Sequence, residues 1–299
     1  MNFNVVSPET TDELLKVIAE NRGNRFRFGA GYTDLLLELK KQPVEGLTVV
    51  NLAHLNDDRF TSIGDLDGAV RVGALVTVNE IASDEGLRRR FPVLCSAAEQ
   101  LGSRQIRQVA TVGGNLCTAS PAGDVACALT ALKARCEILS ADGTERVVPI
   151  GDFFVDVRKT DLKGDEILRG VIIPAGGENR RLYSDFIKIG TRRSMEIAVV
   201  SLAYHLQVDE DDEIADAGIA IGSVAPTIRF VESACDYLTG RKVSELSSLE
   251  AEEFAALVTD YAVPISDLRA SAWYRKEVLF NISKGIFEGW QTQSTSLHG

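Results

Sequence analysis

Two glycine-rich segments contain the residue types that could hold a phosphate group. The first is Phe28-Gly-Ala-Gly-Tyr-Thr-Asp-Leu35, and the second is Gln108-Val-Ala-Thr-Val-Gly-Gly-Asn-Leu-Cys-Thr-Ala-Ser-Pro-Ala-Gly-Asp124. Glycine permits positive φ and lets a ligand approach the backbone closely. Successive exposed N–H groups then form a concave anion site, to which Thr, Asn and Ser side chains add donors. This chemistry suits a pyrophosphate and requires no Lys or Arg, which are scarce in both segments.

The two segments differ in specificity. The first has G-x-G without the third glycine of a Rossmann fingerprint, and the chain contains no G-x-x-x-x-G-K-[ST] motif. A purely structural turn stays open for it, although its place between a strand and a helix would add a helix N-terminus to the site. The second joins Thr111-Val-Gly-Gly-Asn115 to Ser120-Pro-Ala-Gly-Asp124 and lacks the periodicity that core packing requires. It is the stronger prediction of a binding loop.

The first segment belongs to an alternating N-terminal unit. Ser7-Pro-Glu-Thr-Thr-Asp-Glu13 predicts a helix start with Ser7 as the cap. Strand-like runs at 25–28 and 47–52 flank the first segment and the helical pattern of 35–40.

The second segment lies in a longer mixed unit. Thr77-Val-Asn-Glu80 has the spacing of a capping box before a short helix. The stretch from Gly102 to Asp124 is expected to be irregular, between helices at 92–101 and 125–132. Further strands are expected at 69–75, 135–139, 146–150 and 168–173, with a hairpin turn at 141–144.

A third unit follows the polar, glycine-rich linker 175–180. Three strand-like runs at 182–189, 199–208 and 217–224 precede helical patterns from Val231 onward. The pattern is typical of an α+β fold. We expect a domain at 1–175 with subdomains of about 1–57 and 58–175, a C-terminal α+β domain at 176–290, and a tail at 291–299.

Composition limits the function classes. The chain has 299 residues, 45% of them hydrophobic, which is enough for two domains. Its net charge of −11 would repel phosphate backbones, so we expect no nucleic-acid partner. No apolar run approaches the roughly 20 residues that span a bilayer, and the first residues lack the pattern of a secretory signal. We expect a cytoplasmic protein without a membrane span.

Cysteine and histidine positions predict no metal site. The five cysteines include no C-x-x-C pair, and their odd number argues against a disulfide framework. Cys117, Cys127 and Cys136 are close in sequence, but apolar surroundings favour buried thiols, and an iron–sulfur cluster usually takes four cysteines. His54 and His205 match no ligand spacing.

Four motifs, in order along nearly the whole chain, resemble those of a known family. They are Ala30-Gly-Tyr-Thr-Asp-Leu35, Val72-Gly-Ala-Leu-Val-Thr77, Ala110-Thr-Val-Gly-Gly-Asn115 with Thr118-Ala-Ser-Pro-Ala-Gly-Asp124, and Gly222-Ser-Val-Ala-Pro226 with Arg229. The chain resembles the FAD-binding subunit, or middle domain, of molybdenum hydroxylases of the xanthine dehydrogenase and carbon monoxide dehydrogenase type. The resemblance implies FAD as cofactor. It also implies two FAD-binding subdomains of the vanillyl-alcohol oxidase type, followed by a three-stranded antiparallel sheet packed on helices.

The resemblance further implies a role within a complex. A separate molybdopterin subunit would act on the substrate, an iron–sulfur subunit would pass the electrons to FAD, and FAD would deliver them to NAD or another acceptor. No catalytic residue is therefore expected in this chain. Two alternatives stay open: a stand-alone flavin oxidoreductase, for which the chain leaves little room, and a cofactor-free scaffold subunit, against which the intact second segment argues.

The resemblance assigns cofactor contacts residue by residue. The residues that would wrap the pyrophosphate are Gly29, Ala30, Gly31, Tyr32, Thr33, Asp34 and Leu35. Those that would line its second side are Ala110, Thr111, Gly113, Gly114 and Asn115. The remaining assignments are Ser120 and Asp124 near the ribityl and ribose groups, Gly102 and Gln105 near the ring, Leu168 on the adenine or flavin, and Lys188 at the pyrimidine end.

Three of these assignments have alternatives. Many family members have Gly-Gly before the Thr, where this chain has Gly31-Tyr32. Tyr32 would either shield the cofactor or shift the turn. A plain core position is the alternative for Leu168, and a solvated strand lysine is the alternative for Lys188.

Overall fold

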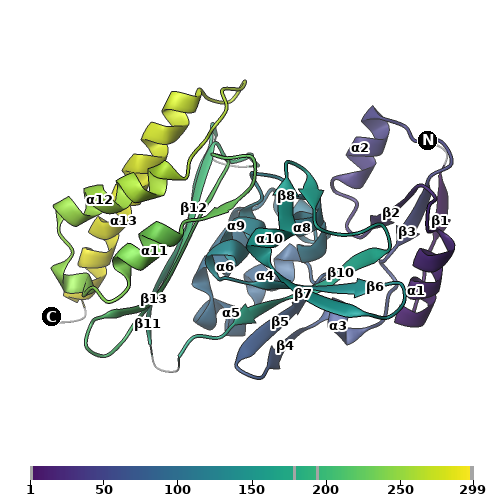
Figure 1. The fold of residues 1–299 in the computed structure, drawn as a ribbon, viewed down its shortest axis with the longest axis horizontal. Coiled ribbons are helices and arrows are strands. Elements are labelled where there is room, and N and C mark those ends of the chain that lie inside the picture. Colours follow the sequence, from purple (N-terminus) through teal and green to yellow (C-terminus); the bar gives the residue numbers. More distant parts are fainter. Residues whose placement is uncertain (1–2, 178–179, 193–194, 297–299) are drawn as a thin grey trace.

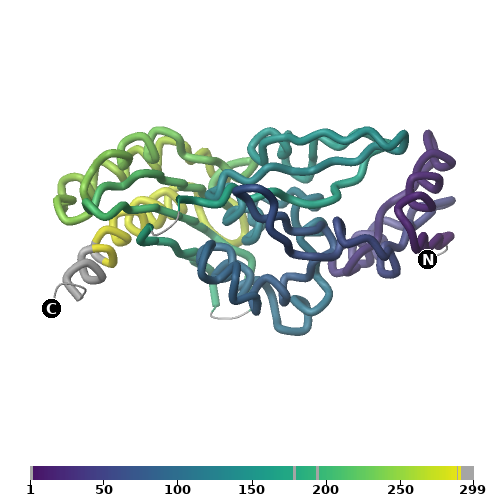
Figure 2. The backbone as a smooth tube through the Cα atoms, turned by 90° about the horizontal axis from the view of Figure 1, so that it is seen from below, coloured from purple at the N-terminus to yellow at the C-terminus, as the bar shows by residue number. Residues whose placement is uncertain are grey.

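Three sheets of three or more strands follow one another along the molecule, which is a computed structural model describing residues 3–177, 180–192 and 195–296 (Figure 1). The molecule is elongated, with the N-terminal unit at one end and the C-terminal helices at the other (Figure 2).

The N-terminal sheet is parallel and has the strand order β1-β3-β2. Its elements are β1 (Asn4–Val6), α1 (Thr11–Glu20), β2 (Phe26–Gly29), α2 (Leu35–Lys41) and β3 (Thr48–Asn51). The predicted cap Ser7 is wrong, because Thr10 accepts the hydrogen bond from the Glu13 N–H and α1 begins after it. Both hydroxyl residues satisfy the capping pattern, and only the local backbone decides between them.

The middle sheet is antiparallel, with the order β4-β5-β10-β6-β7. Its strands are β4 (Ile63–Leu66), β5 (Ala69–Gly73), β6 (Arg135–Ser140), β7 (Glu145–Pro149) and β10 (Glu166–Pro174). The associated helices are α3 (Asp58–Thr61), α4 (Val78–Ser83), α5 (Glu85–Arg90), α6 (Pro92–Gln100), α9 (Asp124–Ala131) and α10 (Ile150–Phe153). The capping box predicted at Thr77 and Glu80 is confirmed at the start of α4.

The stretch from Gly102 to Asp124 is more regular than expected. It contains two short helices, α7 (Arg104–Arg107) and α8 (Val112–Thr118), which are capped by the hydroxyls of Ser103 and Thr111. Helices of one or two turns are too short to show a periodic apolar face.

The C-terminal sheet has the order β11-β12-β13-β14. The sheet contains three long strands, β11 (Arg181–Ile189), β12 (Val200–Val208) and β13 (Ile214–Gly222). A fourth strand of two residues, β14 (Arg229–Phe230), pairs with β13 at the edge of the sheet. The expected three-stranded sheet is therefore wrong by one strand, because β14 pairs only Ala220 with Phe230 and Ile221 with Arg229 and is too short to leave a sequence pattern. The helical elements that cover this sheet are α11 (Glu232–Leu238), the 3₁₀ turn Val243–Glu245, α12 (Ser248–Asp260) and α13 (Ala272–Ser296).

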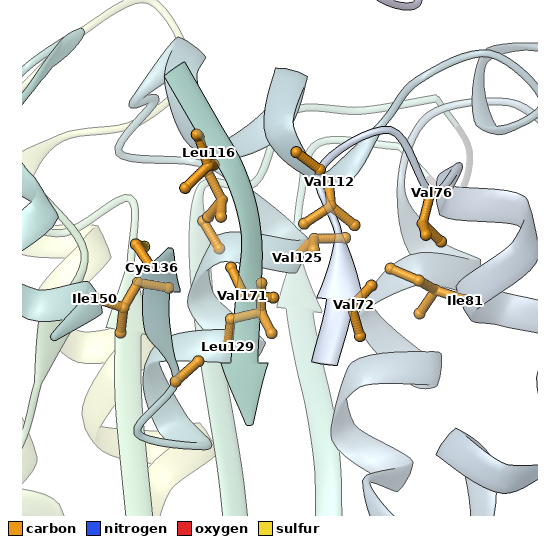
Figure 3. Packing of buried hydrophobic residues seen from close by; sticks show 14 of the residues in the cluster. Val72, Val76, Ile81, Val112, Leu116, Val125, Leu129, Cys136, Ile150 and Val171 are labelled. Carbon is orange, nitrogen blue, oxygen red and sulfur yellow. The ribbon is translucent and has the colours of Figure 1, made fainter. Parts of the chain in front are cut away.

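Helices α6 and α9 join the middle and C-terminal units. Both pack on the C-terminal sheet, and their buried residues also belong to the core of the middle sheet. Figure 3 shows part of this core, where Val72 and Val171 of neighbouring strands lie beside Val112 and Val125. The core extends into the C-terminal sheet through Phe186, Ala203 and Ala220. Within the described ranges, no helix is long and apolar enough to cross a membrane.

Candidate cofactor site

The two glycine-rich segments meet backbone to backbone. A Cβ added to Gly31 would lie 1.8 Å from the carbonyl oxygen of Val109 and 3.1 Å from the Cα of Ala110. Real Cβ atoms do not approach this closely, so Gly31 is required for the contact. The structure thus brings together the two segments that the sequence singles out, although they are far apart along the chain.

The first segment presents unused backbone donors. The N–H groups of residues 31–34 have no hydrogen-bond acceptor among the residues that the structure describes. Tyr32 takes φ +59, a left-handed conformation that favours glycine. Its ring folds over Gly29, and its hydroxyl donates to Asn51 Oδ1 at 2.8 Å. Leu35 is buried at the start of α2, whereas Asp34 is exposed and caps no N–H.

Residues 74–78 support the second segment. The N–H of Gly113 donates to the Ala74 carbonyl at 2.7 Å, and a Cβ on Gly113 would lie 2.8 Å from the Ala74 Cβ. Ala110 accepts a hydrogen bond from the Val78 N–H at 2.8 Å. The motif at 72–77 is therefore explained by its position beneath the second segment, a role that the sequence does not reveal.

Polar side chains fix the shape of the second segment. Thr111 Oγ1 accepts from the Gly114 N–H at 3.0 Å, and Asn115 Oδ1 accepts from the Ala126 N–H at 3.1 Å, which ties α8 to α9. Ser120 Oγ accepts from the Ala122 N–H at 3.2 Å. Gly114 itself is exposed, and outside its chain neighbours and the backbone of its own helix, Thr111 Oγ1 at 3.1 Å is the one described atom within 4 Å of a Cβ placed there.

Asp124 and Lys188 form a buried ion pair. Lys188 Nζ lies 2.6 Å from Asp124 Oδ2, and both side chains are 5% exposed. Lys188 also donates to the Gln100 carbonyl at 3.1 Å. Burial raises the pKa of Asp124 to about 6, and the nearby ammonium group opposes that rise. The alternative of a solvated strand lysine is therefore wrong. Asp124 Oδ1 has no hydrogen-bond partner among the described residues.

A cavity of about 1090 Å³ lies between α6–α7 and the loop after β11. Three predicted residues, Gly102, Gln105 and Lys188, line it. The sequence reasoning missed Arg104 and Arg107, which also line it and whose spacing on a four-residue helix gives no separate signal. Leu168 lies outside the cavity, 3% exposed within the middle core, a position that also suits the plain core alternative.

These features fit a bound dinucleotide. Unused N–H groups at 31–34 are donors for phosphate oxygens, and the glycine contacts remove the side chains that would block them. The buried Asp124 Oδ1 is an acceptor that a ligand hydroxyl or N–H would satisfy.

Each of the five cysteines is a free thiol, and all but Cys117 are buried.

The fold and two family models define a two-part flavin-binding protein. Residues 1–176 match the FAD binding domain in molybdopterin dehydrogenase, and residues 185–288 match the CO dehydrogenase flavoprotein C-terminal domain. The chain belongs to this family of FAD-binding subunits of molybdenum hydroxylases, and FAD is its cofactor.

Proteins similar to this chain over most of its length include flavoprotein subunits and a solved structure. The xanthine dehydrogenase FAD-binding subunit of Escherichia coli O157:H7 is 28% identical, over 93% of this chain and 92% of that protein. The nicotine 6-hydroxylase medium subunit of Paenarthrobacter nicotinovorans is 30% identical, over 89% of this chain and 86% of the relative. A chain of quinoline 2-oxidoreductase from Pseudomonas putida 86 superposes with a TM-score of 0.86 at 25% identity, over 98% of both chains.

Proposed function

We propose that this chain binds FAD across the contact between its two glycine-rich segments. The N–H groups of 31–34 and the residues from Ala110 to Asn115 would hold the pyrophosphate. The cavity beside Gly102, Gln105 and Lys188 would take the isoalloxazine ring. Bound FAD would supply one- and two-electron chemistry, while the chain supplies binding, orientation and electrostatics. The backbone contact of Gly31 with Val109 is the observation that carries this proposal.

We further propose that the chain works as one component of a cytoplasmic complex. An iron–sulfur subunit would deliver electrons, a molybdopterin subunit would act on the substrate, and NAD or another acceptor would remove the electrons. Several relatives are named as subunits, which supports this arrangement. Residues 1–175 would hold FAD in two subdomains of the vanillyl-alcohol oxidase type, with 176–290 as the C-terminal domain. Residues 291–299 would be a tail, although α13 continues through its first part to Ser296.

FAD titration of two glycine variants tests the site. Gly114→Ala adds a methyl group at an exposed position of the second segment, where helix propensity favours alanine. The apoprotein should fold normally, and FAD should bind at least about tenfold more weakly, a loss of about 1.4 kcal/mol. Gly64→Ala is the matched control, because a Cβ there meets nothing within 4 Å and the residue lies on β4, away from both segments.

The measurement is the change in flavin absorption and fluorescence on titration. Equal FAD affinity in Gly114→Ala and Gly64→Ala would contradict the site. A colourless wild-type protein that takes up no added FAD would contradict the function itself.

A further inference from the structure

A small hairpin projects from the middle unit. It consists of β8 (Phe154–Asp156) and β9 (Lys159–Thr160), with Arg158 at its tip. Its base is anchored by Arg146, whose guanidinium lies 2.6 Å from Asp161 Oδ2 and also donates to the Asp161 carbonyl at 2.9 Å. The position of the tip is therefore fixed relative to the middle sheet.

Arg158 contacts the second glycine-rich segment and the helix that follows the first. Its N–H donates to the carbonyl of Ala119, within the second segment, at 3.0 Å. Its Nη1 lies 3.0 Å from Glu38 Oε1 on α2, the helix that continues from the first segment. Glu38 and Arg158 are 120 residues apart in sequence. One residue thus links the two sides of the proposed FAD site.

The other contacts of helix α2 come from a small hydrophobic cluster and from Arg27, which also pairs with Glu38. Its buried residues Leu35 and Leu39 form a small cluster with Leu47 and Val49, separate from the main core. Of its first three residues, Leu36 and Leu37 are exposed. Because the apolar cluster of α2 lies within the N-terminal unit, the contact of Arg158 with Glu38 adds a link from the middle unit to this helix and to the first segment.

We propose that Arg158 is a positioning residue for FAD, which slows the release of the cofactor by tying α2 to the second segment through Glu38. This inference rests on the proposed function, because it requires FAD to lie between the two segments. Separation of the segments would have to break the ion pair of Arg158 with Glu38. The side chains of Arg158 and Glu38 are 55% and 39% exposed, so added salt should weaken their ion pair.

Arg27 provides a matched control. It pairs with the other oxygen of the same carboxylate, at 2.9 Å, and its side chain is 54% exposed. Arg27 lies on β2, in the same N-terminal unit as α2. Arg27→Gln therefore removes an equivalent charge and an equivalent ion pair without cutting the link across the site.

The experiment measures the rate of FAD release from the full-length holoprotein, diluted into a flavin scavenger. Arg158→Gln should release FAD about two- to fivefold faster, the range expected for one partly exposed ion pair. Arg27→Gln should release FAD at the wild-type rate, and Arg158→Lys should keep most of the effect. Raising the salt concentration should accelerate release from the wild type and not from Arg158→Gln.

Two results would overturn the proposal. One is an unchanged release rate in Arg158→Gln, and another is an equal acceleration in Arg27→Gln. The variant Gly114→Ala separates a failure of the proposed FAD site from a failure of the role proposed for Arg158. If that variant binds FAD normally, the site is misplaced. If it binds weakly while Arg158→Gln releases FAD at the wild-type rate, only the role of Arg158 fails.

Discussion

At the level of single residues, the buried ion pair of Asp124 with Lys188 makes the stability of the site depend on pH. Both side chains are 5% exposed, so each charge depends on the other for solvation. Because folding raises the pKa of Asp124 from 3.8 to about 6, the folded state binds this proton more tightly than the unfolded chain. The stabilisation from that proton is complete below about pH 4 and is lost as the pH rises through about 6.

Removal of the lysine should therefore have a pH-dependent cost. Lys188→Met should lower the free energy of unfolding of the apoprotein by about 3–5 kcal/mol at pH 8, because an ionised Asp124 would be left buried without its partner. At pH 5 the loss should be much smaller, since Asp124 can then take up a proton. Chemical denaturation at the two pH values measures both numbers.

Lys284→Met is the control for this prediction. Lys284 lies at the same 2.6 Å from Glu252, but the two side chains are 36% and 55% exposed. Its replacement should cost no more than about 1 kcal/mol at either pH. Equal losses at pH 5 and pH 8 in Lys188→Met would contradict the account of Asp124.

The residues of the site were only partly predictable from sequence. Glycine patterns singled out Gly31 and Gly113, because no other residue allows such close backbone approach. The partners that make those glycines necessary carry no distinguishing sequence signal, since Val109 contributes its backbone carbonyl and Ala74 its methyl group and carbonyl. The ion pair of Asp124 with Lys188 needed three-dimensional information, because Asp124 starts a helix and Lys188 is the next-to-last residue of a strand in a different unit.

At the level of elements, hydroxyl caps set where the short helices α7 and α8 begin. Thr111→Ala should lower stability by about 1 kcal/mol, because the Gly114 N–H loses its acceptor at the start of α8. FAD should also bind more weakly, since α8 forms part of the second segment. Ser247→Ala at the start of α12 should cost a similar free energy and leave FAD affinity unchanged. Denaturation and FAD titration of the two variants provide the comparison, and equal FAD affinities would count against a role for α8.

Long elements were easier to predict than short ones. The hairpin of β6 with β7 and the three long C-terminal strands are confirmed, because each has enough residues for a pattern to repeat. The helices α7 and α8 and the strand β14 were missed, since their boundaries depend on local hydrogen bonds rather than on periodicity.

At the level of the whole molecule, the C-terminal sheet is held by more than the linker that precedes it. Ser96 Oγ donates to Asp185 Oδ1 at 2.6 Å, and the Ser223 N–H donates to the Pro121 carbonyl at 2.7 Å. Helices α6 and α9 supply buried residues to the core that also includes Phe186 and Ala220 of the C-terminal sheet. The middle and C-terminal units should therefore unfold together.

A single glycine at this junction tests that cooperativity. A Cβ on Gly218 of β13 would lie 1.9 Å from the carbonyl oxygen of Ala131 at the end of α9, so Gly218→Ala must displace the sheet from the helix. Overpacking of this kind should lower stability by about 1–3 kcal/mol. Calorimetry should show one transition moved to lower temperature, with FAD released over the same interval, while Gly64→Ala stays near the wild type. A separate C-terminal transition that moves alone, with FAD release unaffected, would show that the two units fold independently and that the sheet does not stabilise the FAD site.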